Sequence, residues 1–390
     1  MKQPRDPGQP RPPMRILLLG TGLKLGGAEQ QVAALARQFI ALGHAVAVVS
    51  LTPGREVDVP EAATQLCLDM RKTPWSMARA LWRLRGFVQD WRPDVIHAHM
   101  VHANVFARAL TRIARTPPVV CTAHSFREGG RLRMLAYRLT DRWATLTTHV
   151  SADGRQGMID AGAVRPERIV VVPNGIDIDR FRPRPELRQA TRAALGLAPG
   201  ARLVLNVGRL VPEKAQDLLL EAFSRLDMTT ESSDRTPHLA IAGDGPERAA
   251  LASAIDRLGL TGRATLLGMR RDIPELLSAA DLFVLSSRIE GMPLVIAEAL
   301  ACGCPVVSTD APGVADMLGD AGQIVPRGDA AALSAAMRRA LEAGAGSPEA
   351  QAARRQRIAA RFGIEAVARQ WLDCYASLAA ARGARCAEPA

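Results

Sequence analysis

Short apolar runs alternate with amphipathic stretches along almost the whole chain, and this alternation most limits the folds that it can adopt. Near-continuous apolar strands separated by helical stretches are typical of parallel sheets with helices on both faces. We therefore predict an α/β fold. The expected strands are 15–19, 45–51, 94–97, 119–121, 203–207, 238–242, 264–267, 282–285 and 305–308, and the expected helices include 28–42, 216–225 and 247–258.

A turn-rich and proline-rich stretch divides this pattern into two similar series. It covers residues 171–186 and reads VVPNGIDIDRFRPRPE. A chain of 390 residues is also too long for one typical hydrophobic core. We predict two Rossmann-like, doubly wound domains, 14–178 and 179–363, after a disordered tail 1–13 and before a terminal segment 364–390. Two such domains would face each other across a cleft at the carboxyl ends of their strands, where ligands bind.

The composition favours a soluble, cytoplasmic protein. The first thirteen residues are polar and rich in proline, unlike a signal peptide, and no apolar run approaches the roughly 20 residues of a membrane-spanning helix. The six cysteines are scattered along the chain, so we expect reduced thiols. Cys302 and Cys304 lack a second cysteine pair near by, which weighs against a zinc site.

The net charge of +11 lies entirely in the first half of the chain. Residues 1–175 hold 24 Lys and Arg against 13 Asp and Glu, whereas residues 176–390 hold 26 of each. This asymmetry suggests that the first half faces an anionic surface, either membrane lipid or nucleic acid. Solvated faces in an Arg-rich chain are the alternative explanation.

The first half carries polar residues at its predicted strand ends. The first strand leads into GTGLKLGGAEQ, whose glycines would let backbone N–H groups approach a phosphate. This spacing differs from a dinucleotide fingerprint, which weighs against an oxidoreductase. His97 and His99 share a strand, and His124 lies at the exit of the next, where it could hydrogen-bond or transfer a proton. A metal site is disfavoured, because no carboxylate ligand lies near these histidines in the sequence.

In the second half, two cations follow a predicted strand. The loop VGRLVPEK places Arg209 and Lys214 before a helix, where they could clamp a diphosphate. A solvated pair of side chains is the alternative. A further glycine-rich strand exit contains Gly243 and reads AGDGPER.

Two glutamates stand in an otherwise apolar segment, IEGMPLVIAEALACGCPVV, at 289–307. Buried charge is costly unless it is paired or hydrogen-bonded. Pro293 suits the first turn of a helix, so Glu290 would precede the helix and Glu298 would lie inside it. Free helix N–H groups near Gly291 would bind phosphate, and the carboxylates would accept hydrogen bonds from sugar hydroxyls. A nucleotide sugar carries both kinds of group.

Taken together, these motifs resemble glycosyltransferase family 4, whose members are retaining enzymes of GT-B fold. The resemblance spans roughly 14–367 and rests on GGAE, VVPNGID, VGRL with EK, AGDGPER and the two glutamates with seven residues between them. TAHSFREGGRLRMLAYRLTDR and THVSADGRQGM are similar to members that build bacterial surface or lipid-linked glycans. The resemblance also implies that a helix at 364–380 crosses back to the first domain.

The resemblance implies a role for each site residue. Arg209 and Lys214 would hold the donor diphosphate. Glu298 would bind the ribose hydroxyls and Glu290 the donor sugar, and His124 would lie near the transferred sugar. We therefore expect His124, Glu290, Arg209 and Lys214 to be catalytic. The other expected donor contacts are Gly26, Gly27, Gly243, Gly291, Met292, Pro293 and Leu294.

The implied reaction is sugar transfer from a nucleotide sugar, with uracil preferred to guanine as the base, and with retention of configuration. Front-face displacement, in which the leaving diphosphate accepts the acceptor's proton, needs no protein nucleophile; double displacement is the alternative. No metal or other cofactor is expected, because Arg209 and Lys214 supply positive charge. Ala215 departs from the glycine usual after the lysine, which suggests a less tightly turned loop.

The expected acceptor is a polyprenyl-diphosphate-linked glycan. The runner-up is a soluble enzyme acting on a small acceptor such as a sugar phosphate or an inositol derivative. A nucleic-acid partner is not expected, because the balanced second half carries sugar-site motifs rather than basic recognition elements.

A helix predicted at 74–91 would bind the membrane. One side carries the expected core stripe, Met77, Leu81, Leu84, Val88 and Trp91. The opposite side carries the expected membrane contacts, which with an upstream lysine are Lys72, Trp75, Arg79, Trp82 and Arg83. Tryptophans beside cations are typical of interfacial helices. We hypothesise peripheral binding to the cytoplasmic face of the inner membrane, with added attraction from Arg127, Arg131 and Arg133; packing of the tryptophans under a loop is the alternative.

Overall fold

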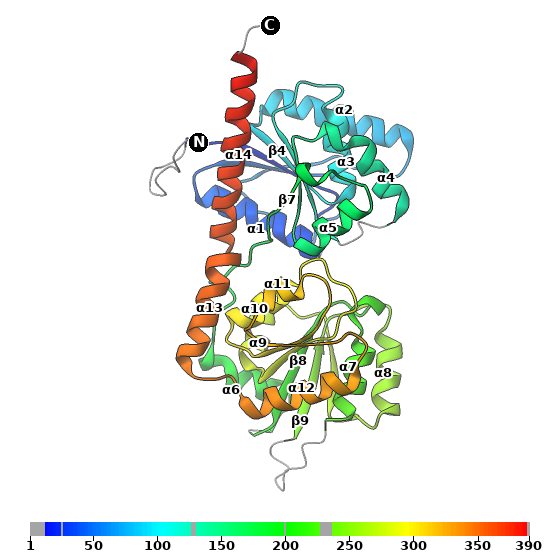
Figure 1. Cartoon of the computed structure of the whole chain (residues 1–390), viewed down its shortest axis with the longest axis vertical. Coiled ribbons are helices and arrows are strands. Elements are labelled where there is room, and N and C mark those ends of the chain that lie inside the picture. The colour runs from blue at the N-terminus through cyan, green and yellow to red at the C-terminus, as the bar shows by residue number, and fades with distance from the viewer. Residues whose placement is uncertain (1–11, 25, 126–129, 199, 227–235, 388–390) are drawn as a thin grey trace.

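The computed structural model describes residues 12–24, 26–125, 130–198, 200–226 and 236–387, with side chains as far as residue 381. Two α/β domains lie one above the other, and two successive helices at the end of the chain run along one side, α13 (Pro348–Phe362) beside one domain and α14 (Ile364–Ala387) beside the other (Figure 1). Each domain is built on one parallel sheet, so the predicted fold class is confirmed. The expected tail at 1–13 lies almost wholly outside the described residues, and the domain limits 178/179 and 363/364 stay predictions.

The first sheet has seven strands in the order β3-β2-β1-β4-β5-β6-β7. Gly20 at the end of β1 pairs with Ser50 of β2 on one side and with His99 of β4 on the other, so these strand exits lie level at one edge. The strands are β1 (Arg15–Gly20), β2 (Ala45–Ser50), β3 (Thr64–Cys67), β4 (Val95–His99), β5 (Val119–Ala123), β6 (Leu146–His149) and β7 (Ile169–Val171).

Helices cover both faces of this sheet because its central strands are apolar on both sides. One face packs against α1 (Gly27–Ala41) and α14 (Ile364–Ala387), and the other against α2 (Pro74–Trp91) and α3 (Val101–Leu110). The helices α4 (Arg131–Thr140) and α5 (Ala152–Asp160) complete the domain beside β5 to β7. Ser151 caps α5 by accepting a hydrogen bond from the Gly154 N–H at 3.2 Å.

The second sheet repeats the same topology with six strands, in the order β10-β9-β8-β11-β12-β13. The strand order reverses at β8, where ligands bind in doubly wound folds. The strands are β8 (Arg202–Val207), β9 (Pro237–Ala242), β10 (Ala264–Gly268), β11 (Leu282–Leu285), β12 (Val306–Thr309) and β13 (Gln323–Val325). The helices are α6 (Pro185–Ala194), α7 (Gln216–Ser224), α8 (Arg248–Arg257), α9 (Ile273–Ala279), α10 (Leu294–Ala301), α11 (Val314–Leu318), α12 (Ala330–Ala343) and α13 (Pro348–Phe362).

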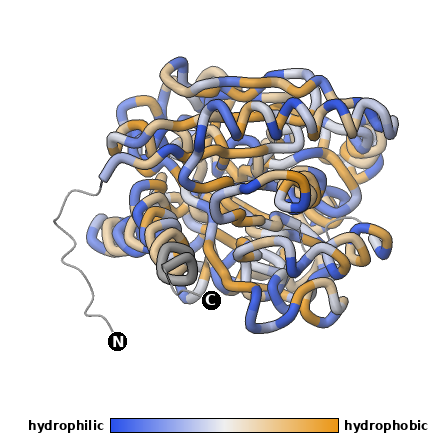
Figure 2. The backbone as a smooth tube through the Cα atoms, turned by 90° about the horizontal axis from the view of Figure 1, so that it is seen from above, coloured by the Kyte–Doolittle hydropathy of each residue, from blue (hydrophilic) through white to orange (hydrophobic). Residues whose placement is uncertain are grey.

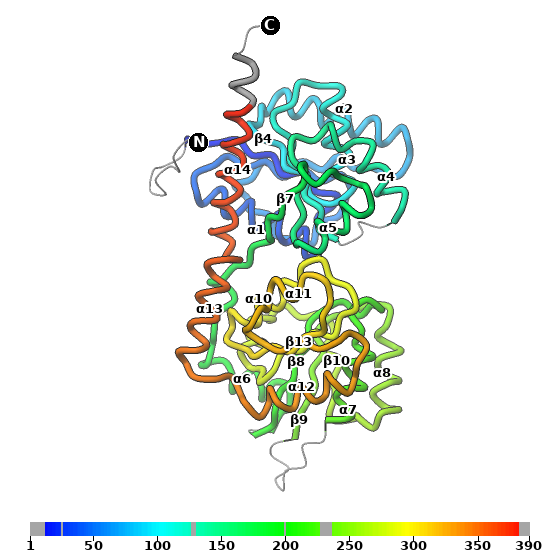
Figure 3. The backbone as a smooth tube through the Cα atoms, in the orientation of Figure 1, coloured from blue at the N-terminus to red at the C-terminus, as the bar shows by residue number. Residues whose placement is uncertain are grey.

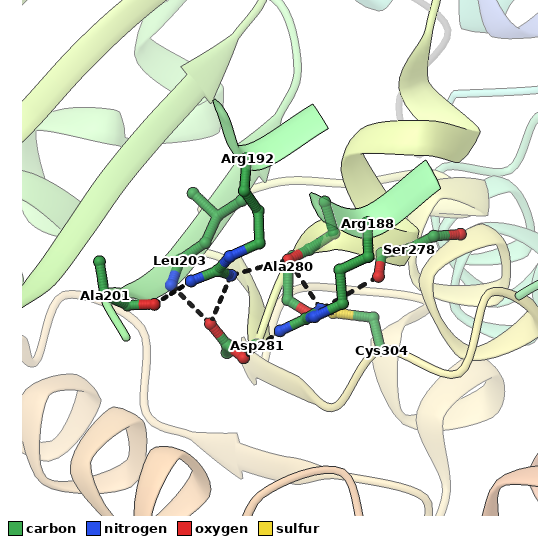
Figure 4. A network of polar contacts seen from close by, with 9 residues as sticks. Arg188, Arg192, Ala201, Leu203, Ser278, Ala280, Asp281 and Cys304 are labelled. Carbon is green, nitrogen blue, oxygen red and sulfur yellow. Dashed lines mark hydrogen bonds and ion pairs between the residues drawn. The ribbon is translucent and has the colours of Figure 1, made fainter. Parts of the chain in front are cut away.

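An arginine network fixes α6 to the second sheet (Figure 4). The Asp281 carboxylate accepts from Arg188 at 2.5 Å, from Arg192 at 3.0 Å and from the Leu203 N–H at 2.7 Å. Arg188 also donates to the carbonyls of Ser278, Ala279 and Ala280. The chain therefore enters the second domain on a rigidly held helix.

The chain passes between the domains twice, and the two passages lie side by side. Ile176 forms an isolated bridge with Gly363, and a Cβ on Gly175 would stand 2.8 Å from the Ile364 Cα. From there α14 runs up to the first domain, as the expected crossover helix does (Figure 3). Its Trp371 and Tyr375 are buried in the core of that domain.

The nine predicted strands are present, and their ends differ from the predicted ones by at most two residues. The sequence did not predict four further strands, which are β3, β6, β7 and β13. They have only three or four residues each, and β3 and β6 are polar. Such runs carry too little apolar periodicity to stand out from loops.

Candidate active site between the two domains

The carboxyl ends of the two sheets meet where the predicted site residues lie. A Cβ on Gly291, in the second domain, would clash with the carbonyl oxygen of His124 at the exit of β5. Farther along, the Gly313 N–H donates to Asp153 of α5 at 2.7 Å, and the Ala152 N–H donates to Asp316 of α11 at 3.4 Å. A surface hollow of about 530 Å³ lined by Arg92 and Arg115 lies at the opposite edge of the first sheet, far from this chemistry.

Lys214 and Glu290 form the central ion pair of this region. The Lys214 Nζ lies 2.6 Å from Glu290 Oε1, which also accepts from the Ser287 hydroxyl at 2.6 Å. Glu290 is only 8% exposed, whereas the lysine side chain reaches the surface. Burial of this carboxylate is therefore compensated by a cation and a hydroxyl, as buried charge requires.

Glu298 lies one turn inside α10 and lacks such compensation. Among the described residues, no hydrogen-bond donor contacts its carboxylate. Burial raises the pKa of Glu298 to about 7, and the positive charge of Arg180 offsets only part of that effect. The two glutamates of the segment thus differ: Glu290 is paired within the protein, whereas Glu298 has no such partner among the described residues.

Arg209 is exposed and faces the first domain. It lies near enough to Glu29, in the first turn of α1, to favour the charged carboxylate there. Burial dominates at that position and raises the pKa of Glu29. The Glu29 side chain folds back over Gly26, and a Cβ there would meet its carboxylate, whereas the space around Gly27 is open.

Glycines allow two backbone segments to approach each other closely beneath Arg209. A Cβ on Gly243 would clash with the carbonyl of Gly208, and a Cβ on Gly245 would clash with that of Leu210. Gly243 also has a φ of +143°, which L side chains rarely adopt. The predicted donor contact Gly243 therefore supports the Arg209 turn from below.

The expected loop before α10 lies where it was predicted. Pro293 directly precedes Leu294, the first residue of the helix. The Met292 sulfur accepts from the Asn174 N–H at 3.2 Å, which ties this loop to the passage between the domains. Ala215 differs from its expectation: with φ +49° and ψ +45° it adopts the left-handed turn that a glycine would make, so the loop is tightly turned.

Four histidines lie in or just after β4, β5 and β6: His97, His99, His124 and His149. His124 Nε2 lies 3.0 Å from His99 Nδ1, and His97 Nδ1 lies 2.5 Å from the hydroxyl of Tyr375. Burial lowers the pKa of His124 to about 3 and those of His97 and His99 well below their usual value. All three rings are therefore neutral at physiological pH. A neutral His124 can hydrogen-bond a substrate, but it lacks the second, acidic ring proton that an imidazolium would give to a departing group.

The helix predicted to bind the membrane is α2, with the predicted ends. Trp75 and Trp82 are 88% and 58% exposed, and Lys72 and Arg79 are exposed as well. Arg83 lies differently, because its guanidinium donates to the carbonyls of Cys67 and Leu68. The predicted core stripe also differs at one position: Ala80, Leu84 and Val88 are buried, whereas Met77 is exposed.

Arg127 lies outside the described residues. Within the described residues, none of the helices combines the length and apolar character needed to cross a membrane.

Sequence reasoning missed several polar residues here. Ser287 and Glu29 stand within motifs that were singled out, so their positions offered a signal. Asp153 also stands within a motif that was singled out, THVSADGRQGM, whereas Asp316 offered no signal; each accepts from a backbone N–H group of the other domain. Tyr375 reaches His97 from a helix 278 residues farther along the chain.

Two facing Rossmann-like domains that meet at the carboxyl ends of their strands define the GT-B fold. The family model for Glycosyltransferase Family 4 matches residues 25–180, and that for Glycosyl transferases group 1 matches residues 188–360. The chain therefore belongs to the glycosyltransferases, with a domain of each of these families.

Characterised relatives resemble this chain over part of their length. The Escherichia coli UDP-Gal:alpha-D-GlcNAc-diphosphoundecaprenol alpha-1,3-galactosyltransferase is 32% identical over 60% of this chain and 62% of its own length. The D-inositol 3-phosphate glycosyltransferase of Mycobacterium tuberculosis is 31% identical over 70% of this chain and 57% of its own. The chain thus spans about three fifths of the length of these relatives.

A solved structure matches almost the entire chain. Anabaena HepE in complex with UDP superposes with a TM-score of 0.80 at 25% identity, covering 93% of this chain and all of that one. The same protein has also been solved with UDP-glucose.

Proposed function

We propose that this protein transfers a sugar from a UDP-sugar to a lipid-linked diphosphate acceptor in the assembly of a cell-surface glycan. The observation that carries the proposal is the unequal state of the two glutamates. Glu290 is buried and held beside Lys214, whereas Glu298 is half-buried and its carboxylate has no protein donor among the described residues. A ribose diol supplies the donors that Glu298 lacks. The UDP complexes of HepE and the galactosyltransferase relative support this choice of ligand and acceptor.

In the proposed donor complex, the diphosphate lies beside Arg209 and Lys214. Lys214 is already oriented by Glu290, and Arg209 extends into solvent from a turn packed on Gly243. Their positive charges stabilise the negative charge that develops on the leaving diphosphate. Glu290 keeps an oxygen, Oε2, for a donor hydroxyl, because both of its contacts use Oε1.

We propose retention by front-face displacement, without a resident metal. The leaving diphosphate accepts the proton of the acceptor hydroxyl, the glycosidic bond forms on the same face, and UDP departs. His124 is suited to hydrogen-bond the sugar in its neutral form rather than to act as an acid, because its pKa is about 3. The positive charge needed at the diphosphate comes from Arg209 and Lys214.

The acceptor side belongs to the first domain, which holds all the excess positive charge of the chain. We propose that α2 seats this domain peripherally on the anionic cytoplasmic face of the inner membrane through Trp75, Arg79 and Trp82. Binding to vesicles tests this. Trp75→Ala/Trp82→Ala/Arg79→Glu should lose binding to anionic vesicles; equal sedimentation of this variant and the wild type would reject the role of α2.

A second candidate acceptor is small and soluble, as in the inositol phosphate relative. Both acceptors carry phosphate, so the positive charge of the first domain suits either. Transfer of label from a UDP-sugar to a polyprenyl-diphosphate sugar, but not to inositol phosphate, would support the lipid acceptor. The reverse result would favour the small one.

The donor is tested by thermal shift with UDP-glucose, GDP-glucose and ADP-glucose. A ligand that binds only the folded state raises the melting temperature. We expect a shift with UDP-glucose that Glu298→Ala reduces and the exposed-site control Glu342→Ala keeps. No shift with any of the three, or an equal shift in Glu298→Ala, would contradict the proposed donor site.

A further inference from the structure

Helix α4 has one side firmly anchored in the first domain. The Tyr137 hydroxyl accepts from the amide of Asn104 at 2.7 Å, and the Arg108 guanidinium lies over the Tyr137 ring at 4.7 Å. Arg108 also donates to the Tyr137 carbonyl and to the Thr140 hydroxyl, both at 3.2 Å. All four of these residues are buried. The orientation of α4 is therefore fixed by α3.

The opposite side of α4 exposes a row of leucines. Leu132, Leu135 and Leu139 are 82%, 48% and 63% exposed. Their spacing of three and four residues places them on one face of the helix, one above the other. We call these three residues the leucine row. Large apolar side chains gathered on one exposed face mark an interaction site more often than scattered ones do.

Arginines border the leucine row. At 100° per residue, Arg131, Arg138 and the following Arg142 fall along one side of it, and all three are exposed. The segment from Gly130 to Thr140 holds no Asp or Glu. Within the part of the chain that the structure describes, no carboxylate forms an ion pair with any of the three. The face is thus apolar at its centre and positive at its edge.

Helix α2 begins close to the beginning of α4. Lys72, just before α2, and Arg133, in α4, both act on His102 in the first turn of α3, where they help burial to lower the pKa of that histidine. Both helices lie on the side of the first domain away from α14 (Figure 1). Seen from above, hydrophobic and hydrophilic residues alternate along the outer helices of the molecule (Figure 2). The helices α2 and α4 therefore lie on the same side of the domain.

We propose that α4 is a membrane-docking helix whose leucine row enters the interfacial region of an anionic bilayer while its arginines contact lipid phosphates. Leucines on one face with bordering arginines are typical of helices that lie in the membrane interface. An anionic lipid surface complements this face along its whole length, because it offers apolar chains below and phosphates above. Docking of α4 does not depend on the donor site. Its biological role rests on the proposed function, because docking would bring the protein to a lipid-linked acceptor.

Docking through α4 would place the bilayer beside the acceptor side of the site. The chain leaves β5 at His124 and enters α4 at Arg131, so the leucine row follows the candidate catalytic histidine by eight to fifteen residues.

The test compares full-length wild type with Leu132→Ser/Leu135→Ser/Leu139→Ser on vesicles of phosphatidylcholine, with and without phosphatidylglycerol. Met269→Ser/Ile324→Ser, which removes exposed apolar residues from the second domain, is the matched control. We expect the α4 variant to bind anionic vesicles at least tenfold more weakly, with an unchanged melting temperature, and the control to bind as the wild type does. Equal binding by the α4 variant and the wild type would overturn the proposal.

Two further measurements separate the alternatives. Sedimentation velocity tests whether a second copy of the chain covers the leucine row: a wild-type dimer that Leu135→Ser dissociates would overturn membrane docking. Transfer to a water-soluble, short-chain diphosphate acceptor should be unchanged in the α4 variant, because its donor site is intact. Vesicle binding through α4 without transfer to any lipid diphosphate would reject the proposed function and leave the docking helix standing.

Discussion

Gly291 of the second domain lies against the carbonyl oxygen of His124 in the first, so closely that a side chain at 291 has no room. The contact brings the helix α10, which carries Glu298, to the exit of β5. The two domains therefore approach each other at one backbone contact beside the candidate site.

Gly291→Ala should push the domains apart. We expect kcat/KM to fall by about 100-fold, because misplacement of reacting groups by about 1 Å costs that much. Gly86→Ala is the control, since a Cβ there, in the middle of α2, meets nothing within 4 Å; it should be neutral or stabilise by up to about 1 kcal/mol. Initial rates and small-angle scattering measure both effects. A Gly291→Ala protein with wild-type rates would show that the contact is not needed.

Removal of Lys214 should damage both stability and donor binding. Lys214→Met leaves the Glu290 carboxylate buried with the Ser287 hydroxyl as its only described partner, which we expect to cost on the order of 2 kcal/mol. Lys214→Met/Glu290→Gln should recover much of that stability but not UDP binding. Calorimetry measures both quantities.

The exposed pair of Arg369 and Glu365 provides the control for this experiment. Arg369→Met should change the free energy of unfolding by about 0.5 kcal/mol or less, because exposed pairs contribute little. UDP binding by Lys214→Met at wild-type affinity would remove Lys214 from the donor site.

UDP binding should depend on the protonation of Glu298. Its pKa is about 7, so the carboxylate that accepts from the ribose is present above pH 7 and is lost below it. We expect UDP affinity to fall by up to about tenfold from pH 8 to pH 6. Glu298→Gln should bind UDP more weakly and show a flatter profile. A wild-type profile without a transition near pH 7 would contradict the assignment.

Glu298 should also make stability depend on pH. Its folded pKa lies above the ordinary value of 4.5, so the folded state binds the proton more tightly than the unfolded state does. The free energy of unfolding that this group contributes is therefore full below pH 4.5 and decreases as the pH rises toward 7. Glu298→Gln should melt at a higher temperature than wild type at pH 8, as expected of a site residue kept for binding.

Asp153 and Asp316 should hold the domains together at a second place. Each accepts from a backbone N–H of the other domain, so Asp153→Ala/Asp316→Ala removes both contacts. We expect a larger radius of gyration without ligand and a return toward the wild-type value with UDP. Asp160→Ala, at the far end of α5, is the control. An unchanged radius in the double variant would mean that the other interdomain contacts suffice.

Most of the fold could be predicted because buried parallel strands such as RILLLG and LVLNV are continuous apolar runs. The shortest strands could not, since three or four polar residues become a strand only through pairing with neighbours. The motifs predicted that Glu290 and Lys214 belong to the site. They did not predict the ion pair between the two side chains, which depends on two loops 76 residues apart. Arg83 shows the same limit: the helical wheel places it beside the tryptophans, yet carbonyls of another segment draw it inward.

The helix α14 has a consequence for how the chain is made. Its Trp371 and Tyr375 complete the core around β1 and β4, although more than 270 residues separate them from those strands. During synthesis, the first domain leaves the ribosome with this part of its core uncovered, and it stays so while the entire second domain is translated. The helix α13 is available to pack on the second domain as soon as that domain has been synthesised. We therefore expect the second domain to reach its final packing first, although it is synthesised last.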